Sequence, residues 1–213
     1  DLEAAIDSYK QAIKIKPDYA GAYSNMGSAL NDKGDLEAAI DSYKQAIKIK
    51  PDIAEAYYNM GIALKDKGDL EAAIDSYKQA IKIKPDTAEA YYNMGVALKG
   101  KGDLGAAIDC FTQAVKIKPD YAEAYSNMAN ALKDKGDLEA AIDSCKQALK
   151  IKPDFAEAYY NMGVALQDKG DLEAAIDSYK QALKIKPDFA EVYNNLGIAL
   201  MDKSDLGAAI DSY

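Results

Sequence analysis

Apolar residues recur at helical spacing in two successive segments of the chain, residues 54–66 and 69–84. The first segment carries Ala56, Tyr57, Met60, Ala63 and Leu64, and the second carries Leu70, Ala73, Ile74, Tyr77, Ala80, Ile81 and Ile83. Spacings of three, four and seven residues place each set on one face of an α-helix. Neither short helix can bury its apolar face alone, so the pattern predicts a packed helix pair.

Polar residues, glycine and proline mark the expected ends of these helices. Asp52 precedes Glu55 by three residues, the spacing of a capping box in which each side chain satisfies a free backbone amide. Gly68 is expected to end the first helix in a left-handed turn, and Asp69 to cap the second helix. Pro85 then prevents the second helix from continuing.

The two-helix pattern recurs every 34 residues. The string Asp-Leu-x-Ala-Ala-Ile-Asp-Ser begins at residues 1, 35, 69, 137, 171 and 205, a related copy begins at 103, and prolines stand at 17, 51, 85, 119, 153 and 187. We therefore expect one array over residues 1–213, with units starting at 1, 35, 69, 103, 137, 171 and 205. The first and last units are incomplete, and residues 205–213 are expected to begin a further second helix.

The motif Tyr57-x-x-Met60-Gly61-x-x-Leu64, followed by Ala73-x-x-x-Tyr77 and Pro85, resembles the tetratricopeptide repeat. The resemblance covers essentially the whole chain. It implies an all-α fold, an α-solenoid of stacked antiparallel helix pairs forming a right-handed superhelix whose first helices line a concave groove. It also implies that the helices of a pair approach most closely at Gly61 and its counterparts. Ala129 departs from glycine there, which a slightly wider crossing should tolerate.

Most positions that differ between the repeats lie on one stripe of the first helix. Two of these positions supply the predicted selectivity residues Tyr58, Tyr92 and Tyr160, and Lys65, Lys99 and Lys133. A further variable position follows each Pro-Asp pair and holds Tyr19, Ile53, Thr87, Tyr121, Phe155 and Phe189. The resemblance assigns the stripe on the first helix to the concave surface.

One polar residue of the first helix never varies among the full copies: Asn25, Asn59, Asn93, Asn127, Asn161 and Asn195. A carboxamide has a donor and an acceptor, so it can pair with a peptide backbone. Equivalent helices about 10 Å apart and a peptide rising about 3.3 Å per residue would bring one Asn to about every third peptide residue. The arrangement resembles the asparagine ladder of the superhelical repeats in O-linked N-acetylglucosamine transferases, which implies main-chain recognition. The alternative is a structural Asn that bonds only to neighbouring helices.

Composition argues against catalysis and against nucleic acid. The chain has no His and no Arg, and its formal charge is −9. It therefore lacks the imidazole of a catalytic couple or metal site and the guanidinium of an anion clamp, and acidic chains bind phosphate backbones poorly. We expect no enzyme, catalytic residue, metal or cofactor. Cys110 and Cys145 match no ligand motif and are expected to be buried or half-buried free thiols in a reducing compartment. No apolar run is long enough to cross a membrane, and the expected location is cytoplasmic.

The sequence thus favours a non-catalytic protein–protein interaction scaffold that binds an extended peptide or protein segment along a concave groove. The first alternative is a self-associating solenoid. Uncapped terminal helices would stack end to end, burying Leu2, Ala5, Ile6 and Tyr9 of one copy against Leu206 and Ile210 of the next. The second alternative is the substrate-docking arm of a larger enzyme, such as a glycosyltransferase.

Overall fold

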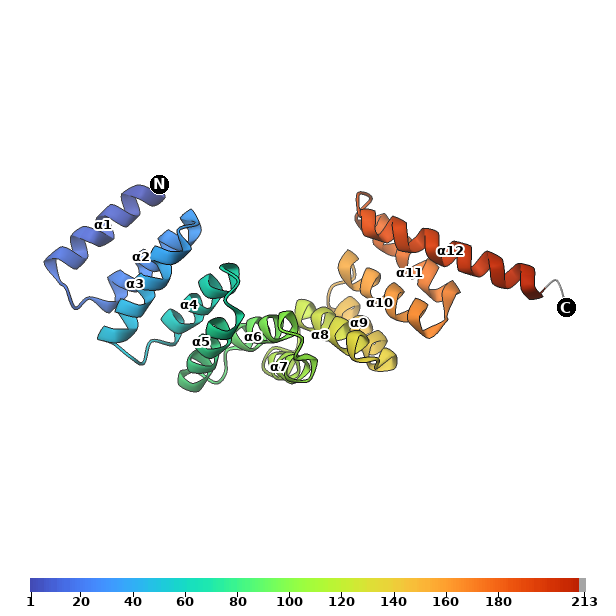
Figure 1. The fold of residues 1–213 in the computed structure, drawn as a ribbon, viewed down its shortest axis with the longest axis horizontal. Helices are drawn as coiled ribbons and strands as arrows, with labels where there is room; N and C mark the ends of the chain where they lie inside the picture. The colour runs from blue at the N-terminus through green and yellow to red at the C-terminus, as the bar shows by residue number, and fades with distance from the viewer. Residues whose placement is uncertain (211–213) are drawn as a thin grey trace. The chain divides into compact units, whose positions relative to one another are not determined.

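The computed structural model describes residues 1–210, with side chains up to residue 204, and these residues form twelve helices and no strand (Figure 1). The helices are α1 (Leu2–Ile15), α2 (Ala20–Lys33), α3 (Leu36–Ile49), α4 (Ala54–Asp66), α5 (Leu70–Ile83), α6 (Ala88–Gly100), α7 (Leu104–Ile117), α8 (Ala122–Lys135), α9 (Leu138–Ile151), α10 (Ala156–Lys169), α11 (Leu172–Ile185) and α12 (Ala190–Ile210). The all-α prediction is confirmed.

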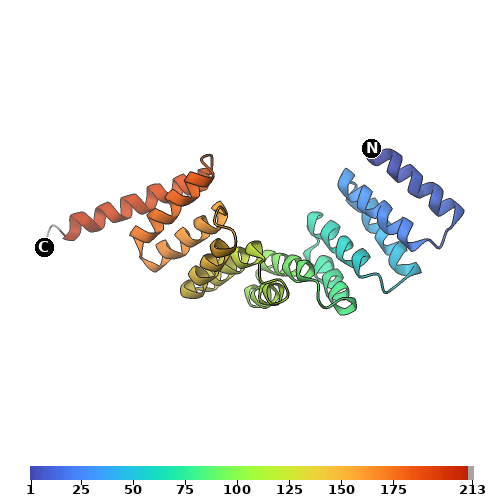
Figure 2. The same ribbon diagram turned by 180° about the vertical axis from the view of Figure 1, so that it is seen from behind.

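The chain divides into two compact units, Asp1–Cys110 and Phe111–Tyr213, and the boundary falls inside α7. In the first unit each helix packs on the next, from α1 to α6, and in the second unit the same holds from α8 to α12. Each unit is therefore an α-solenoid of stacked helix pairs. Figures 1 and 2 show the α2–α3 and α10–α11 hairpins from opposite sides.

Within each unit the first helices of the repeats approach one another, whereas the second helices do not. In the first unit α2 contacts α4 and α4 contacts α6, but α3 makes no such contact with α5. In the second unit α10 contacts both α8 and α12, and α9 makes none with α11. Since closer spacing marks the inner side of a curved stack, the first helices line the inner side of each unit.

The predicted caps are confirmed for the second helices and wrong for the first helices. One carboxylate oxygen of each capping Asp accepts a backbone N–H three residues later at 3.1–3.2 Å; these residues are Asp35, Asp69, Asp103, Asp137 and Asp171. The capping box expected at Asp52 does not form. Asp52 lies in the Pro-Asp turn, and α4 begins at Ala54 with Ile53 at the cap position and no side-chain cap.

The close approach predicted at Gly61 is confirmed. A Cβ added there would lie 2.6 Å from Cε1 of Tyr77, a ring that is fully buried in the core. Ala129 occupies the equivalent position of the fourth complete repeat, where Cys145 replaces the tyrosine and both residues are buried. Cys145 is smaller than tyrosine and leaves room for the methyl group of Ala129. The paired substitution therefore accounts for the alanine without the wider helix crossing that we expected.

The helix α12 differs from the prediction. Each earlier first helix is followed by a glycine in the left-handed conformation, with φ of +83° to +91°; these residues are Gly34, Gly68, Gly102, Gly136 and Gly170. Ser204 replaces this glycine, and its Oγ instead donates to the carbonyl oxygen of Leu200 at 2.9 Å. A side chain disfavours the left-handed turn, so α12 runs on to Ile210 and the separate helix expected from Asp205 is wrong. The predicted contacts of Leu206 and Ile210 lie outside the side chains that the structure describes.

Candidate functional site

The side chains that the sequence singled out on the first helices lie partly open to solvent. Among the asparagines Asn25 is exposed, and the other five, Asn59, Asn93, Asn127, Asn161 and Asn195, are half-buried. The predicted selectivity residues Tyr58, Tyr92, Tyr160, Lys65, Lys99 and Lys133 are also half-buried. A ligand on the inner side of either unit could therefore reach these groups.

Three of the asparagines donate across the gap between successive first helices. Asn93 Nδ2 donates to Tyr58 Oη at 2.9 Å, and Asn195 Nδ2 donates to Tyr160 Oη at 3.3 Å. Where a serine replaces that tyrosine, Asn161 Nδ2 donates to Ser126 Oγ at 3.0 Å. These bonds hold each carboxamide in a set orientation, so the structural role that the sequence left open is present in the fold.

The remaining asparagines follow this pattern less closely. Asn59 Nδ2 lies 3.5 Å from Ser28 Oγ, which is one turn further along α2 than the equivalent acceptors. Asn127 Nδ2 donates to the carbonyl oxygen of Glu123 in its own helix at 3.1 Å. Asn25 lies on α2, the first of the described first helices, and is exposed. The local setting of the invariant residue therefore differs between repeats.

The carbonyl oxygens of Asn59, Asn93 and Asn161 accept no hydrogen bond from any residue that the structure describes. A carboxamide oxygen has two lone pairs, so each of these groups keeps an acceptor for a ligand while an N–H of the same group is engaged. Asn195 Oδ1 is different, since it lies 3.3 Å from Asn194 Nδ2.

Sequence reasoning missed the hydroxyl partners of the asparagines. The signal was present in the variable position of the stripe, which holds Ser24, Tyr58, Tyr92, Ser126, Tyr160 and Asn194. The first five all carry a hydroxyl group, although tyrosine and serine differ greatly in size. At Tyr58, Ser126 and Tyr160 this hydroxyl is the acceptor for the asparagine one repeat later.

Tyr58 and Tyr160 of the stripe also pack on buried rings. Tyr58 lies 6.1 Å from Tyr77 between ring centroids, and Tyr160 lies 6.3 Å from Tyr179. Burial is the main cause that raises the pKa of Tyr58 above its usual value; the nearby Glu89 adds to the shift, and the Asn93 hydrogen bond opposes it. The phenol is therefore neutral at physiological pH and keeps its own O–H as a donor.

Two of the three predicted lysines have their charge balanced by the next residue. Lys65 Nζ lies 2.9 Å from an Asp66 oxygen, and Lys133 Nζ lies 2.7 Å from an Asp134 oxygen. Such partly exposed pairs contribute little to stability. Their consequence for selectivity is that an anionic ligand would compete with an aspartate already beside each ammonium group.

The two cysteines are confirmed as buried free thiols. Burial, aided by Asp109 and Asp103, raises the pKa of Cys110 to about 11, and burial raises the pKa of Cys145 to about 12. A thiol acts as a nucleophile through its thiolate, and both thiols are protonated at neutral pH. In the part of the chain that the structure describes, no three His, Cys, Asp or Glu side chains gather as a metal site. None of the described helices has the length and apolarity that spanning a bilayer requires.

Comparisons with known proteins agree with this architecture. The sequence model of the TPR repeat matches residues 1–30, 27–68, 63–102, 97–136, 129–170 and 166–204. The solved structure described as "YrrB: a TPR protein with an unusual peptide-binding site" superposes with a TM-score of 0.76 at 25% identity, over 93% of this chain and 99% of that one. The MamA protein gives a TM-score of 0.74 at 31% identity, over 81% of this chain and 94% of that one.

A third solved structure, the Cut9–Hcn1 hetero-tetramer of the APC/C, shares the fold at a TM-score of 0.74 and 19% identity, over 94% of this chain and 40% of that one. Comparison with curated proteins gives no match. The repeat model covers residues 1–204, and the structure places those residues in stacked helix pairs. The chain therefore belongs to the tetratricopeptide-repeat (TPR) family.

Proposed function

We propose that this chain is a non-catalytic scaffold that binds an extended polypeptide along the inner side of its first helices. The main support for the proposal is that the carboxamides of Asn59, Asn93 and Asn161 use only part of their hydrogen-bonding capacity within the fold. An N–H of each group donates to the preceding repeat, or lies near it in the case of Asn59, and the oxygen accepts nothing from the described residues. Each oxygen is available to a backbone N–H of a bound segment.

The engaged N–H makes the free oxygen a better acceptor for a ligand. A side chain that is already oriented loses less conformational freedom on binding, which is the general benefit of preorganisation. Each peptide N–H···O bond replaces a bond to water, so its net contribution is about 0.5–1.5 kcal/mol. Several such contacts are needed for useful affinity, and none of them depends on the ligand's side chains.

One of the similar solved structures supports the same class of ligand. YrrB is described as having a peptide-binding site, and it aligns with this chain over nearly its full length. That description concerns YrrB itself. For the present chain it favours a peptide over a small molecule as the ligand of the inner surface.

Paired substitutions in the two units test the proposal. Asn93→Ala and Asn161→Ala each remove one oxygen acceptor, and each should weaken an extended peptide by roughly 2- to 12-fold in fluorescence anisotropy. Gln79→Ala and Gln147→Ala are the matched controls, because they remove exposed carboxamides from the second helices α5 and α9. These controls should leave the affinity unchanged.

The peptide offers an independent arm of the same experiment. N-methylation of single peptide residues removes one backbone N–H at a time. Affinity should fall at about every third residue, the spacing expected from helices about 10 Å apart. Full affinity of both Asn→Ala variants at unchanged helicity, together with a flat N-methyl profile, would contradict main-chain recognition.

A second candidate function is end-to-end association of copies of this chain. Tyr193, Leu200 and Met201 of α12 are 56%, 46% and 69% exposed, whereas among the equivalents of the first two on α4 and α10, Leu64 is buried and Tyr57, Tyr159 and Leu166 are half-buried. The helix α1 has the sequence of α11 apart from Ile13 in place of Leu183, so α1 of another copy offers the surface that α12 lacks. Light scattering over a concentration series tests this, and a constant monomer mass would refute it.

A further inference from the structure

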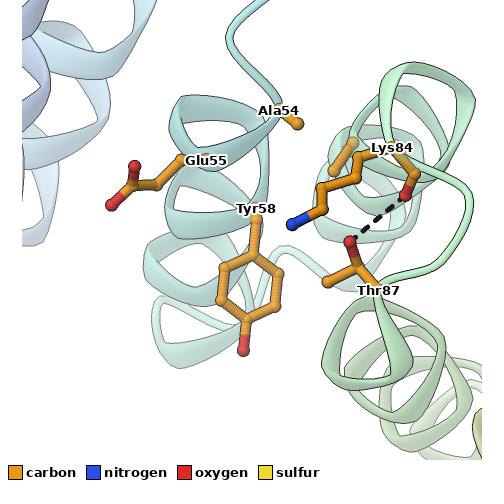
Figure 3. Close-up of a pocket in the computed structure, with 6 residues that line it drawn as sticks. Ala54, Glu55, Tyr58, Lys84 and Thr87 are labelled. Carbon is orange, nitrogen blue, oxygen red and sulfur yellow. Dashed lines mark hydrogen bonds between the residues drawn. The ribbon is translucent and has the colours of Figure 1, made fainter.

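A pocket of about 230 Å³ opens beside Tyr58 in the first unit (Figure 3). Its lining comes from α4, α5 and the residue before α6, and consists of Ala54, Glu55, Tyr58, Ala80, Lys84 and Thr87. We propose that this pocket takes an aromatic side chain, phenylalanine or tyrosine, of the polypeptide that the scaffold binds. The inference rests on the proposed function and names one residue class that the ligand must contain.

The pocket exists because Thr87 is small. The position after Pro-Asp holds an aromatic residue in four of the six copies, namely Tyr19, Tyr121, Phe155 and Phe189. Ile53 and Thr87 are the exceptions. Because the ring is missing at Thr87, the space beside Tyr58 stays open.

The second unit shows how an aromatic ring fills the equivalent space. Phe189 packs on Tyr160 with 5.3 Å between ring centroids, and Lys186 Nζ lies 4.5 Å from the Phe189 centroid. Tyr58, Thr87 and Lys84 occupy the same three positions three repeats earlier in the chain. Phe189, which follows the sixth Pro-Asp pair, therefore shows how an aromatic ring of the ligand would lie in the pocket beside Tyr58.

The side chains of Tyr58 and Lys84 provide suitable contacts for such a ring. Tyr58 is supported from behind by Tyr77, and its hydroxyl accepts the Asn93 N–H at 2.9 Å, so its orientation is held. Lys84 Nζ makes no ion pair and covers no ring among the described residues, although it points into the space between Tyr58 and Thr87 in Figure 3. A cation placed over an aromatic face is attracted by the ring quadrupole. An apolar cavity of about 150 Å³ is large enough to bind benzene, so the volume is sufficient.

The second unit shows that the charged residues at this position are compatible with a neutral ring. In the second unit Lys186, the equivalent of Lys84, lies 3.8 Å from Glu157 and yet covers the Phe189 ring. In Figure 3 the Glu55 carboxylate points away from Lys84 and Thr87, so Tyr58 and Lys84 are the groups that face the open space. A neutral ring uses both of them, as Phe189 uses Tyr160 and Lys186.

The test uses the full chain and a small probe, N-acetyl-phenylalaninamide, followed by NMR of the backbone amides. The probe should shift the amides around Thr87 in a saturable way. N-acetyl-cyclohexylalaninamide has a similar shape without the ring quadrupole, and it should bind about two- to fivefold more weakly. Equal affinity of the two probes, or no saturable shift near Thr87, would overturn the proposal.

Two reciprocal substitutions complete the test. Thr87→Phe should reproduce the Phe189 arrangement, close the pocket and abolish the shifts, with helicity and unfolding midpoint at least as high as in the parent chain. Phe189→Thr should open a second pocket beside Tyr160 and add a second set of shifts there. Persistent probe binding to Thr87→Phe would refute the assignment, even if Phe189→Thr lowered stability.

The failure of this inference can be told apart from failure of the proposed function. Extended peptides with and without one phenylalanine are compared on the parent chain and on Thr87→Phe. A preference for the phenylalanine peptide that Thr87→Phe removes supports the pocket. Equal binding of both peptides with dependence on Asn161 overturns the pocket and leaves the scaffold function standing. Probe binding without any peptide binding supports the pocket and overturns the scaffold function.

Discussion

The contact between Gly61 and Tyr77 predicts that Gly61→Ala destabilises the chain when residue 77 is tyrosine and stabilises it when residue 77 is cysteine. Gly61→Ala places a methyl group 2.6 Å from the Tyr77 ring. Overpacking of this kind costs about 1–3 kcal/mol, and the better helix propensity of alanine returns about 1 kcal/mol. We expect a net loss of about 1 kcal/mol of unfolding free energy.

The ring is absent in a Tyr77→Cys background, which copies the Cys145 of the fourth complete repeat. The same Gly61→Ala change should then stabilise the chain by about 1 kcal/mol through propensity alone. The coupling energy of the double-mutant cycle is thus expected near 2 kcal/mol, within the range for residues in direct contact. Tyr77→Cys itself removes a fully buried ring and should cost several kcal/mol.

Urea unfolding followed by circular dichroism measures the cycle, provided that all four variants share one m-value. Repeat arrays can unfold in parts, so hydrogen exchange of amides in α4 and α5 supplies a local readout. Ala129→Gly is the natural counterpart, and it should cost about 1 kcal/mol where Cys145 is already present. Additive effects, or destabilisation by Gly61→Ala in both backgrounds, would refute the packing argument.

Three further predictions follow from single side chains. Tyr77 Oη is buried with no partner among the described residues, so Tyr77→Phe should leave stability unchanged or raise it by up to about 1 kcal/mol, whereas Tyr179→Phe removes a 2.8 Å hydrogen bond and should cost about 1 kcal/mol in urea unfolding. Ser204→Gly should end α12 near that residue, read by hydrogen exchange, and the reverse change Gly170→Ser should cost about 1–2 kcal/mol at φ +88°. Burial raises the pKa of Cys145 to about 12, so a thiol reagent should react slowly at neutral pH and faster in urea, and the stability that the neutral thiol provides is lost as pH rises from the usual thiol range toward that value. Fast labelling without urea would refute the buried assignment.

The sequence predicted the helix pairs because their signals are local. The Asp69 cap, the left-handed Gly68 and the Gly61–Tyr77 approach each depend on residues within about one repeat, and the structure confirms all three. The final helix break failed for an equally local reason, since Ser204 cannot take the place of glycine at low cost. The capping box failed because Asp52 matches the spacing of the motif but belongs to the Pro-Asp turn.

The candidate site could be predicted only in part, because its contacts join residues about 35 positions apart. The pattern identified Asn93 and Tyr58 separately, and the structure joins them through one hydrogen bond. Which atoms of a carboxamide remain free is set by such contacts between repeats. The pocket at Thr87 depends on a residue that is unremarkable in its own repeat and informative only beside Phe189.

The near identity of the repeats creates a problem of register that the Thr87 pocket can solve. In the first unit, Asn59 and Asn93 each offer a carboxamide oxygen, so a ligand held by its main chain alone, as proposed, could shift by one repeat with little change in energy. Such degeneracy raises the number of bound arrangements without selecting one. The proposed aromatic pocket beside Tyr58 would distinguish the arrangements, because only one of them places an aromatic side chain against Tyr58 and Lys84. On the two proposals, the main-chain contacts would contribute affinity, and the pocket at Thr87 would select the register.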